Sequence, residues 1–174
     1  MGMQIVLIPA QPCYAELWLR WRQEASTVRY NPLAPANLDQ LRARLASARS
    51  DLTELTAASE VCLFAREAEA LVGSLTLKGV SEMMMYAEIG YTIGEEFQGR
   101  GVGTAAVRAF VEKIFAETPL RRLYAHVAEG NVASRKLLER LGFVKEGTLR
   151  EHYVINGVPT NEIVYGLLRG ELSR

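Results

Sequence analysis

Three glycines stand at alternate positions in residues 98–103, Gln-Gly-Arg-Gly-Val-Gly, directly before a helix-forming run. A glycine costs a helix about 1 kcal/mol relative to alanine, so three at a helix start need a physical reason. The N-terminus of a helix carries unpaired N–H groups and about half a positive charge, which together bind phosphate. Glycine has no Cβ atom to hold a bulky phosphate away from the backbone. The spacing therefore predicts a phosphate-binding loop, with tight helix–strand packing as the alternative reason for the glycines.

The residues around this loop narrow the kind of phosphate ligand. No Lys-Ser or Lys-Thr pair follows the glycines, which excludes a P-loop. Residues 101–106 do match the dinucleotide pattern G-x-G-x-x-A, and Glu129 lies just beyond the next expected strand. A dinucleotide fold also requires further parallel β–α–β units, whereas the C-terminal part of this chain is typical of an antiparallel hairpin. An NAD-type binding module stays open as an alternative.

Hydrophobic periodicity predicts the elements that position the loop. Apolar residues at helical spacing indicate helices, and alternation of apolar with polar residues indicates strands. Asn37 is suited to cap the second helix, and Asn156-Gly157 is typical of a hairpin turn. The expected strands are 3–10, two within 60–80, 83–93, 121–128 and two within 149–168, and the expected helices are 13–23, 37–50, 101–117 and 131–143. This order gives a mixed α/β sheet with a single β–α–β crossover in its middle.

The composition fits one globular domain that covers residues 1–174. Of the 174 residues 49% are apolar and 23% are charged, an ordinary globular balance. Lys plus Arg and Asp plus Glu number 20 each, so neither nucleic acid nor a membrane surface is expected as a partner. Cys13 and Cys62 lack metal-ligand spacing, and no signal peptide or apolar run near the ~20 residues of a membrane span is present. We expect a cytoplasmic protein with reduced cysteines and no metal.

Two motifs resemble those of the GNAT superfamily of N-acetyltransferases. Residues 98–103 match the Q/R-x-x-G-x-G/A loop that holds the pyrophosphate of acyl-CoA in that family. Residues 131–143, N-V-A-S-R-K-L-L-E-R-L-G-F, resemble its second signature, in which an asparagine opens the helix beside the cofactor thiol. The segments 88–93 and 146–168 are similar to the RimJ/RimL-like subgroup of ribosomal-protein N-terminal acetyltransferases. The resemblance covers nearly all of the chain and is strongest over residues 86–168.

The resemblance implies a fold and a cosubstrate. The implied GNAT fold is of the α/β (α+β) class, with a mixed, mostly antiparallel central sheet splayed into a V and flanked by about four helices. Acetyl-CoA would lie in the V, and Gly94 would sit at a bulge or bend that helps the strands to part. The residues implied to bind acetyl-CoA are Tyr91, Ile93, Gln98, Gly99, Arg100, Gly101, Val102, Gly103, Thr104, Asn131 and Ser134.

The implied reaction is direct attack of a primary amine on the thioester in a ternary complex. It requires a neutral amine, a hydrogen-bond donor for the oxyanion and a proton source for the thiolate. The residues implied to be catalytic are Glu88, Asn131 and Ser134. Glu88 would relay the amine proton, with His152 and Tyr153 as rivals, while Ser134 and Asn131 would hydrogen-bond the thiolate.

Other residues near these motifs are expected to serve structure. Leu137 and Leu138 stand where many relatives have a tyrosine that acts as general acid, so that mechanism does not transfer to this chain. His126 lies in the middle of an expected strand and is expected to be structural. Met83–Met85 are expected to pack within a strand.

The protonation state of the amine bears on the acceptor. An α-amine of pKa near 8 is about one-tenth neutral at pH 7, whereas a lysine amine is only about 0.04% neutral. We therefore expect a protein or peptide N-terminal α-amine, with a polyamine, an amino acid or an aminoglycoside as alternatives. Trp18, Trp21 and Tyr30 would border the acceptor cleft or else fill the core. A CoA-binding sensor without turnover, and a homodimer, also stay open.

Overall fold

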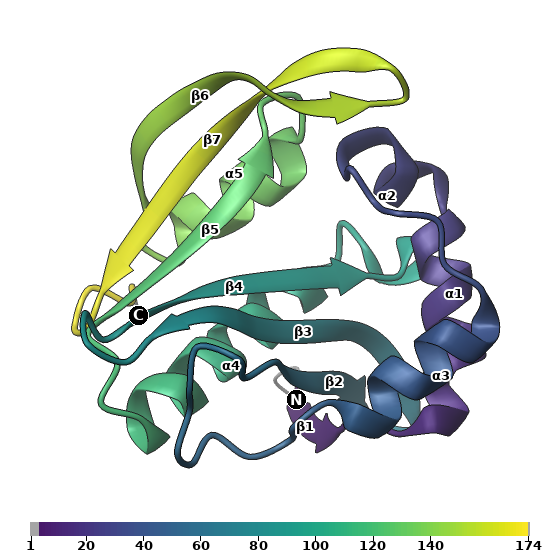
Figure 1. The fold of residues 1–174 in the computed structure, drawn as a ribbon, viewed down its shortest axis with the longest axis horizontal. Helices are drawn as coiled ribbons and strands as arrows, with labels where there is room; N and C mark the ends of the chain where they lie inside the picture. The colour runs from purple at the N-terminus through teal and green to yellow at the C-terminus, as the bar shows by residue number, and fades with distance from the viewer. Residues whose placement is uncertain (1–3, 174) are drawn as a thin grey trace.

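The computed structural model describes residues 4–173, which form a seven-stranded sheet (Figure 1). The strands run in the order β1-β2-β3-β4-β5-β7-β6, and neighbours are antiparallel except for the parallel pair β4–β5. The mixed, mostly antiparallel sheet that the resemblance implied is confirmed. The strands are β1 (Ile5–Pro9), β2 (Val61–Glu67), β3 (Ala70–Ser81), β4 (Tyr86–Ile93), β5 (Arg122–Ala128), β6 (Val144–Ile155) and β7 (Val158–Leu168).

Five α-helices accompany the sheet in residues 4–173, one more than the four expected. The additional helix is α2, whose six residues are too few to show an apolar period. The cap predicted at Asn37 is confirmed, because its side chain accepts from the N–H of Gln40 and the Gln40 side chain accepts from the N–H of Asn37. None of these helices is long and apolar enough to cross a membrane. The helices are α1 (Ala15–Gln23), α2 (Ala25–Tyr30), α3 (Leu38–Ser47), α4 (Val102–Glu117) and α5 (Val132–Arg140), with short 3-10 helices at Pro12–Tyr14 and Glu95–Phe97.

The strand expected from residue 83 begins later than predicted. β4 starts at Tyr86, and Met83–Met85 form the turn that joins it to β3. Met85 has a φ of 54°, in the left-handed region that strands do not use. Met83 is 80% exposed. The expectation that these methionines pack within a strand is wrong.

Strands β4 and β5 separate after a short contact and form a V (Figure 1). They pair only from Tyr86 to Glu88, opposite residues 122–124. Beyond Glu88, one edge of β4 stays paired with β3. The other edge of β4, which faces β5, pairs with no strand of residues 4–173 beyond Glu88. Backbone groups on that edge are therefore free to bind an extended ligand.

Gly94 follows β4, and its missing side chain serves packing. The Cβ of any other residue would lie 2.5 Å from Nε1 of Trp21, whose side chain is fully buried. The N–H of Gly94 donates to the carbonyl oxygen of Val72 at 3.1 Å. The register of β4 with β3 continues without a shift at this end. Of the bulge or bend expected at Gly94, the structure shows the bend, because the chain turns there into the 3-10 helix that follows.

Helices cover both faces of the sheet. α4 and α5 pack on one face over a core that includes Phe110, while α1 and α3 pack on the other around Trp21 and Phe64. The buried run VCLFA of β2 contributes alternately to the two cores, as expected for a strand covered on both faces. Burial raises the pKa of the Cys62 thiol to about 12. Cys62 and the exposed Cys13 are both free thiols.

Candidate active site

A cavity of about 620 Å³ lies at the mouth of the V. Its walls come from β4, β5, the glycine loop, the start of α5 and the residues around α2. Asn156 in the β6–β7 turn reaches α2, where its Nδ2 donates to the carbonyl oxygen of Val28 at 3.5 Å. The hairpin and α2 thus meet on one side of the cavity. All of the predicted site residues line this cavity except Arg100 and Val102.

The glycine loop has the geometry of an anion-binding helix start. Gly99 and Gly101 adopt left-handed φ values of 74° and 83°, and among the described residues no atom lies within 4 Å of the position their Cβ would take. No side chain caps α4 at Gly101, so the first N–H groups of the helix remain available to a ligand. Gly103 differs, because a Cβ there would lie 3.1 Å from Leu137 and 3.3 Å from Ile93. Two glycines leave open space beside the helix start, and the third permits packing.

Gln98 braces the loop from inside. Its Nε2 donates to the carbonyl oxygen of Ile93 at 2.8 Å and to Oγ of Ser26 at 3.2 Å. These contacts tie the end of β4 to α2. The loop conformation is therefore held by the protein itself.

The side chains of Arg100 and Val102 point away from the cavity. Nη2 of Arg100 lies 3.8 Å from Oε2 of Glu67, and Val102 is fully buried in the core. Their predicted contribution to cofactor binding is thus restricted to main-chain N–H groups, and it stays a prediction. Thr104, in the first turn of α4, does line the cavity.

Tyr91 and Ser134 meet at the start of α5. The Tyr91 hydroxyl lies 2.7 Å from Oγ of Ser134, and Oδ1 of Asn131 accepts a hydrogen bond from the Ser134 N–H at 3.1 Å. Asn131 thus caps the helix and fixes the turn that carries Ser134. Burial raises the pKa of Tyr91 above its ordinary value, so its hydroxyl keeps a proton that it can donate. Tyr91 was predicted to bind acetyl-CoA, but no role for its hydroxyl was predicted, because a pairing across 43 residues leaves no local pattern.

Glu88 lies where β4 and β5 part. It is the last β4 residue paired with β5, opposite Tyr124, and its side chain is 19% exposed. Its Oε1 lies 3.4 Å from Nζ of Lys78 on β3. Burial, and after it the charge of Glu88, raises the pKa of the Tyr124 phenol. Glu88 is an anion on the cavity wall that already has a cationic partner.

A second carboxylate, Glu162 of β7, is fully buried beside the cavity wall. Its Oε1 lies 2.9 Å from Nδ1 of His126, and its Oε2 lies 3.4 Å from Nε2 of His152. Neither oxygen accepts a hydrogen bond of ordinary geometry from the residues that the structure describes. Burial, followed by the Glu162 carboxylate, raises the pKa of the Tyr153 phenol. We call these four residues the Glu162 cluster.

Two members of the Glu162 cluster belong to the cavity. His126 and Tyr153 line it, although His126 was expected to be structural. Glu162 was not among the predicted site residues. The cluster is not a metal site, since within residues 4–173 no group of three or more His, Cys, Asp or Glu side chains is placed to hold a metal ion.

A bulge in β6 brings His152 and Tyr153 to Glu162. Three β6 residues oppose the single β7 residue Asn161 at this point. The middle one, Glu151, has a φ of 51°, and its N–H donates to Oδ1 of Asn161 at 2.9 Å. A left-handed φ is uncommon outside glycine, and bulges of this kind re-aim side chains next to functional sites.

The carboxylate of Glu129 is already hydrogen-bonded within the protein and is not free to bind a nucleotide ribose. Its Oε2 accepts a hydrogen bond from Nδ2 of Asn161 at 2.9 Å. The strands after α5 are antiparallel, whereas a dinucleotide fold continues with parallel units. Both observations count against the NAD-type alternative.

Known proteins that resemble this chain identify its family. The model of the acetyltransferase (GNAT) domain matches residues 4–144. The chain is similar to the putative ribosomal N-acetyltransferase YdaF of Bacillus subtilis (strain 168), with 39% identity over 101 residues. That match covers 58% of this chain and 55% of the relative, so the chain spans little more than half of the relative's length.

Solved structures share the fold. Mycobacterium smegmatis RimJ in complex with CoA-disulfide matches with a TM-score of 0.84 at 22% identity, over 98% of this chain and 84% of that chain. Spermidine N-acetyltransferase from Vibrio cholerae in complex with CoA and spermine matches with a TM-score of 0.83 at 22% identity, over 97% of each chain. The family model includes the glycine loop, the V and α5. The chain belongs to the GNAT acetyltransferase family.

Proposed function

We propose that the protein is an N-acetyltransferase that moves the acetyl group of acetyl-CoA to a primary amine, preferably the N-terminal α-amine of a protein or peptide. One observation carries the proposal: the glycine loop, the unpaired edge of β4 and the Tyr91–Ser134 pair all lie at one cavity. They correspond to an anion site, a site for an extended chain and a proton donor. Membership of the GNAT family supports the same activity.

The described residues fit acetyl-CoA. The N–H groups from Gly99 to Thr104 lie at a helix N-terminus, where the two left-handed glycines leave space for a pyrophosphate. The free edge of β4, up to Ile93, can pair with the pantetheine arm as an added strand would. When bound, acetyl-CoA supplies an activated acetyl thioester and a thiolate leaving group.

The Tyr91–Ser134 pair is suited to protonate the leaving sulfur. Ser134 can donate its Oγ–H toward a thiolate at the start of α5, and the Tyr91 hydroxyl, 2.7 Å away, can donate in turn to Ser134. Tyr91 is protonated at neutral pH, since the ordinary pKa of tyrosine is near 10 and burial raises it further. The N-terminus of α5 adds a favourable potential for developing negative charge.

The acceptor preference rests on proton chemistry and on a relative's name. An α-amine needs less help from a base than a lysine amine does. The relative YdaF is named a putative ribosomal N-acetyltransferase, which supports a protein α-amine as acceptor. The spermidine N-acetyltransferase among the similar structures makes a polyamine the second candidate. Because such substrates occur in the cytoplasm, we propose that the reaction takes place there. That the protein forms a homodimer stays a prediction.

Calorimetric titration with acetyl-CoA tests the proposal. Gly101→Asp introduces a side chain and a negative charge at the helix start and should weaken binding by about 100-fold or more. Gly170→Asp is the matched control, because Gly170 also has a left-handed φ, 97°, with no described atom within 4 Å of its Cβ position. A folded wild type that does not bind acetyl-CoA would overturn the proposal. Release of CoA with peptides that carry a free α-amine, or with spermidine, then identifies the acceptor class.

A further inference from the structure

The Glu162 cluster contains both histidines of the chain around one buried carboxylate. The closer contact is that of Nδ1 of His126, 2.9 Å from Oε1 of Glu162. Since the two ring nitrogens lie on different edges of an imidazole, Nε2 of His126 faces away from this carboxylate. His126 itself lines the cavity of the V. A carboxylate at Nδ1, with Nε2 on the far edge of the ring of a cavity-lining histidine, is an arrangement that suits an imidazole to act as a general base.

We propose that Nε2 of His126 removes the proton of the acceptor amine and that Glu162 is the positioning residue. Its carboxylate, 2.9 Å from Nδ1, favours the tautomer protonated at Nδ1 through its charge, although the contact is not aligned as an ordinary hydrogen bond. This inference rests on the proposed acetyltransferase function and names its base. The residues predicted from the sequence for this role were Glu88, with His152 and Tyr153 as rivals.

The three earlier candidates are less suited to the role than His126. Glu88 already has an ion-pair partner, since Nζ of Lys78 lies 3.4 Å from its Oε1. Tyr153 keeps its proton, since burial and Glu162 both raise the pKa of its phenol. His152 is 55% exposed and lies 3.4 Å from Glu162, farther than His126 does.

The proton balance of the reaction assigns one group to each transfer. The acceptor arrives as an ammonium ion, and one N–H bond breaks while its electron pair stays on nitrogen as the attacking lone pair. That proton forms a bond to Nε2 of His126 and then passes to solvent, with Glu162 stabilising the transient imidazolium. As the C–S bond breaks, the sulfur takes one proton from the Tyr91–Ser134 pair. A second proton leaves the nitrogen and replaces the proton that this pair has lost. Ammonium and thioester thus become amide, thiol and one released proton.

The fold supports this assignment with a strained segment. The β6 bulge, with its left-handed Glu151, closes over Glu162 from the side opposite β5. Strain of this kind collects where it holds a functional group in place. Titratable side chains from four strands surround His126. They are Glu88 on β4, Tyr124 on β5, His152 and Tyr153 on β6, and Glu162 on β7.

The test compares His126→Asn and Glu162→Gln with the wild type. CoA release is measured from pH 6 to pH 10 at saturating acetyl-CoA, with an alanine-initiated peptide and with spermidine as acceptors. Both variants should lose about 100-fold in kcat/KM at pH 7, and the loss should shrink as pH rises, because hydroxide then supplies the neutral amine that the base no longer provides. Acetyl-CoA affinity should not change. Glu117→Gln, a carboxylate paired with Lys113 at the far end of α4, controls for loss of one negative charge and should keep the wild-type profile.

A second measurement reads the imidazoles directly. With only two histidines in the chain, nitrogen NMR resolves the tautomer of each. His126 should carry its proton on Nδ1 in the wild type and shift toward Nε2 in Glu162→Gln. A proton on Nε2 in the wild type would overturn the proposal, as would His126→Asn with an unchanged pH profile, or a loss found only in His152→Asn. If the wild type binds acetyl-CoA but releases CoA with no amine, the proposed function fails, whereas active wild type with unaffected variants contradicts this inference alone.

Discussion

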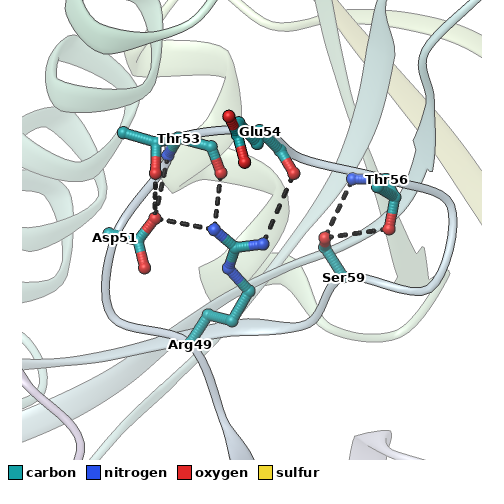
Figure 2. A network of polar contacts seen from close by, with 6 residues as sticks. All are labelled: Arg49, Asp51, Thr53, Glu54, Thr56 and Ser59. Atoms are coloured by element: carbon teal, nitrogen blue, oxygen red, sulfur yellow. Dashed lines mark hydrogen bonds and ion pairs between the residues drawn. The ribbon is translucent and has the colours of Figure 1, made fainter.

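Two polar clusters of this molecule differ in how fully their charges are satisfied. In the loop between α3 and β2, Arg49 holds three neighbours (Figure 2). Its Nη2 donates to Oδ1 of Asp51 at 2.7 Å and to the carbonyl oxygen of Thr53 at 2.6 Å, and its Nη1 donates to the carbonyl oxygen of Glu54 at 3.4 Å. The Thr53 hydroxyl, followed by the Arg49 guanidinium, holds the pKa of Asp51 well below its usual range. The charges of Arg49 and Asp51 thus have well-placed partners.

The Glu162 cluster has the opposite character. Its carboxylate is fully buried, yet the contacts with His126 and His152 lack ordinary hydrogen-bond geometry. A buried charge without full hydrogen bonding reduces stability. The contacts of the Arg49 loop can be explained by their contribution to stability alone. The Glu162 cluster lowers stability, so its presence needs a functional explanation. Base chemistry at His126 is the reason that we infer.

The largest stability effect is expected at Glu162. Replacement by methionine, which has a similar volume and no charge, should raise the free energy of unfolding by about 1–3 kcal/mol at pH 8, above the ordinary pKa of imidazole. The same variant should lose acetyl transfer. Urea denaturation beside a CoA-release assay measures both effects. A fall in unfolding free energy of about 3 kcal/mol or more would mean that charged imidazoles already neutralise Glu162, and the contrast with the Arg49 loop would disappear.

The loop-to-helix motifs could be predicted because their physics is local. The helix cap at Asn37 and the left-handed glycines at 99 and 101 depend on residues a few positions away. Gly103 shows a limit of such reasoning. Its position within the motif suggested access for a phosphate, and the structure adds contacts with Leu137 and Ile93 that no spacing reveals.

Glu162 could not be predicted, because its burial is created by distant segments. In the alternation of β7 it lies on the opposite face from Ile163, where a polar residue normally meets solvent. That face is covered by His126, on a strand 36 positions earlier, and by the bulged part of β6. Neither the bulge nor the pairing of β5 with β7 has a sequence signature here. The one available hint was that both histidines of the chain lie in expected strands.

A smaller stability effect of opposite sign is expected in the Arg49 loop. Arg49→Ala removes three charge-assisted contacts and should lower the free energy of unfolding by about 1–2 kcal/mol, since the side chain is partly exposed. Acetyl-CoA binding and turnover should not change. Arg42→Ala, on an exposed pair with Glu16, is the matched control and should shift stability by less than about 0.5 kcal/mol. Loss of activity in Arg49→Ala would show that this loop also serves the site.

The smallest effect is a pH dependence within the same loop. The pKa of Asp51 is lower in the folded protein than the ordinary value near 3.9, so its contribution to stability is fully present above that value. The contribution is lost as pH falls toward the folded pKa, because the unfolded chain then binds the proton first. Asp51→Asn should therefore be less stable than the wild type at pH 7, and the difference should shrink steadily between about pH 4 and pH 2. Urea midpoints at these pH values measure it, with Asp39→Asn, on an exposed helix pair, as the control. A difference that stays constant over this range would mean that Asp51 stabilises the loop through its shape and its hydrogen bonds to Thr53, and that its charge contributes nothing.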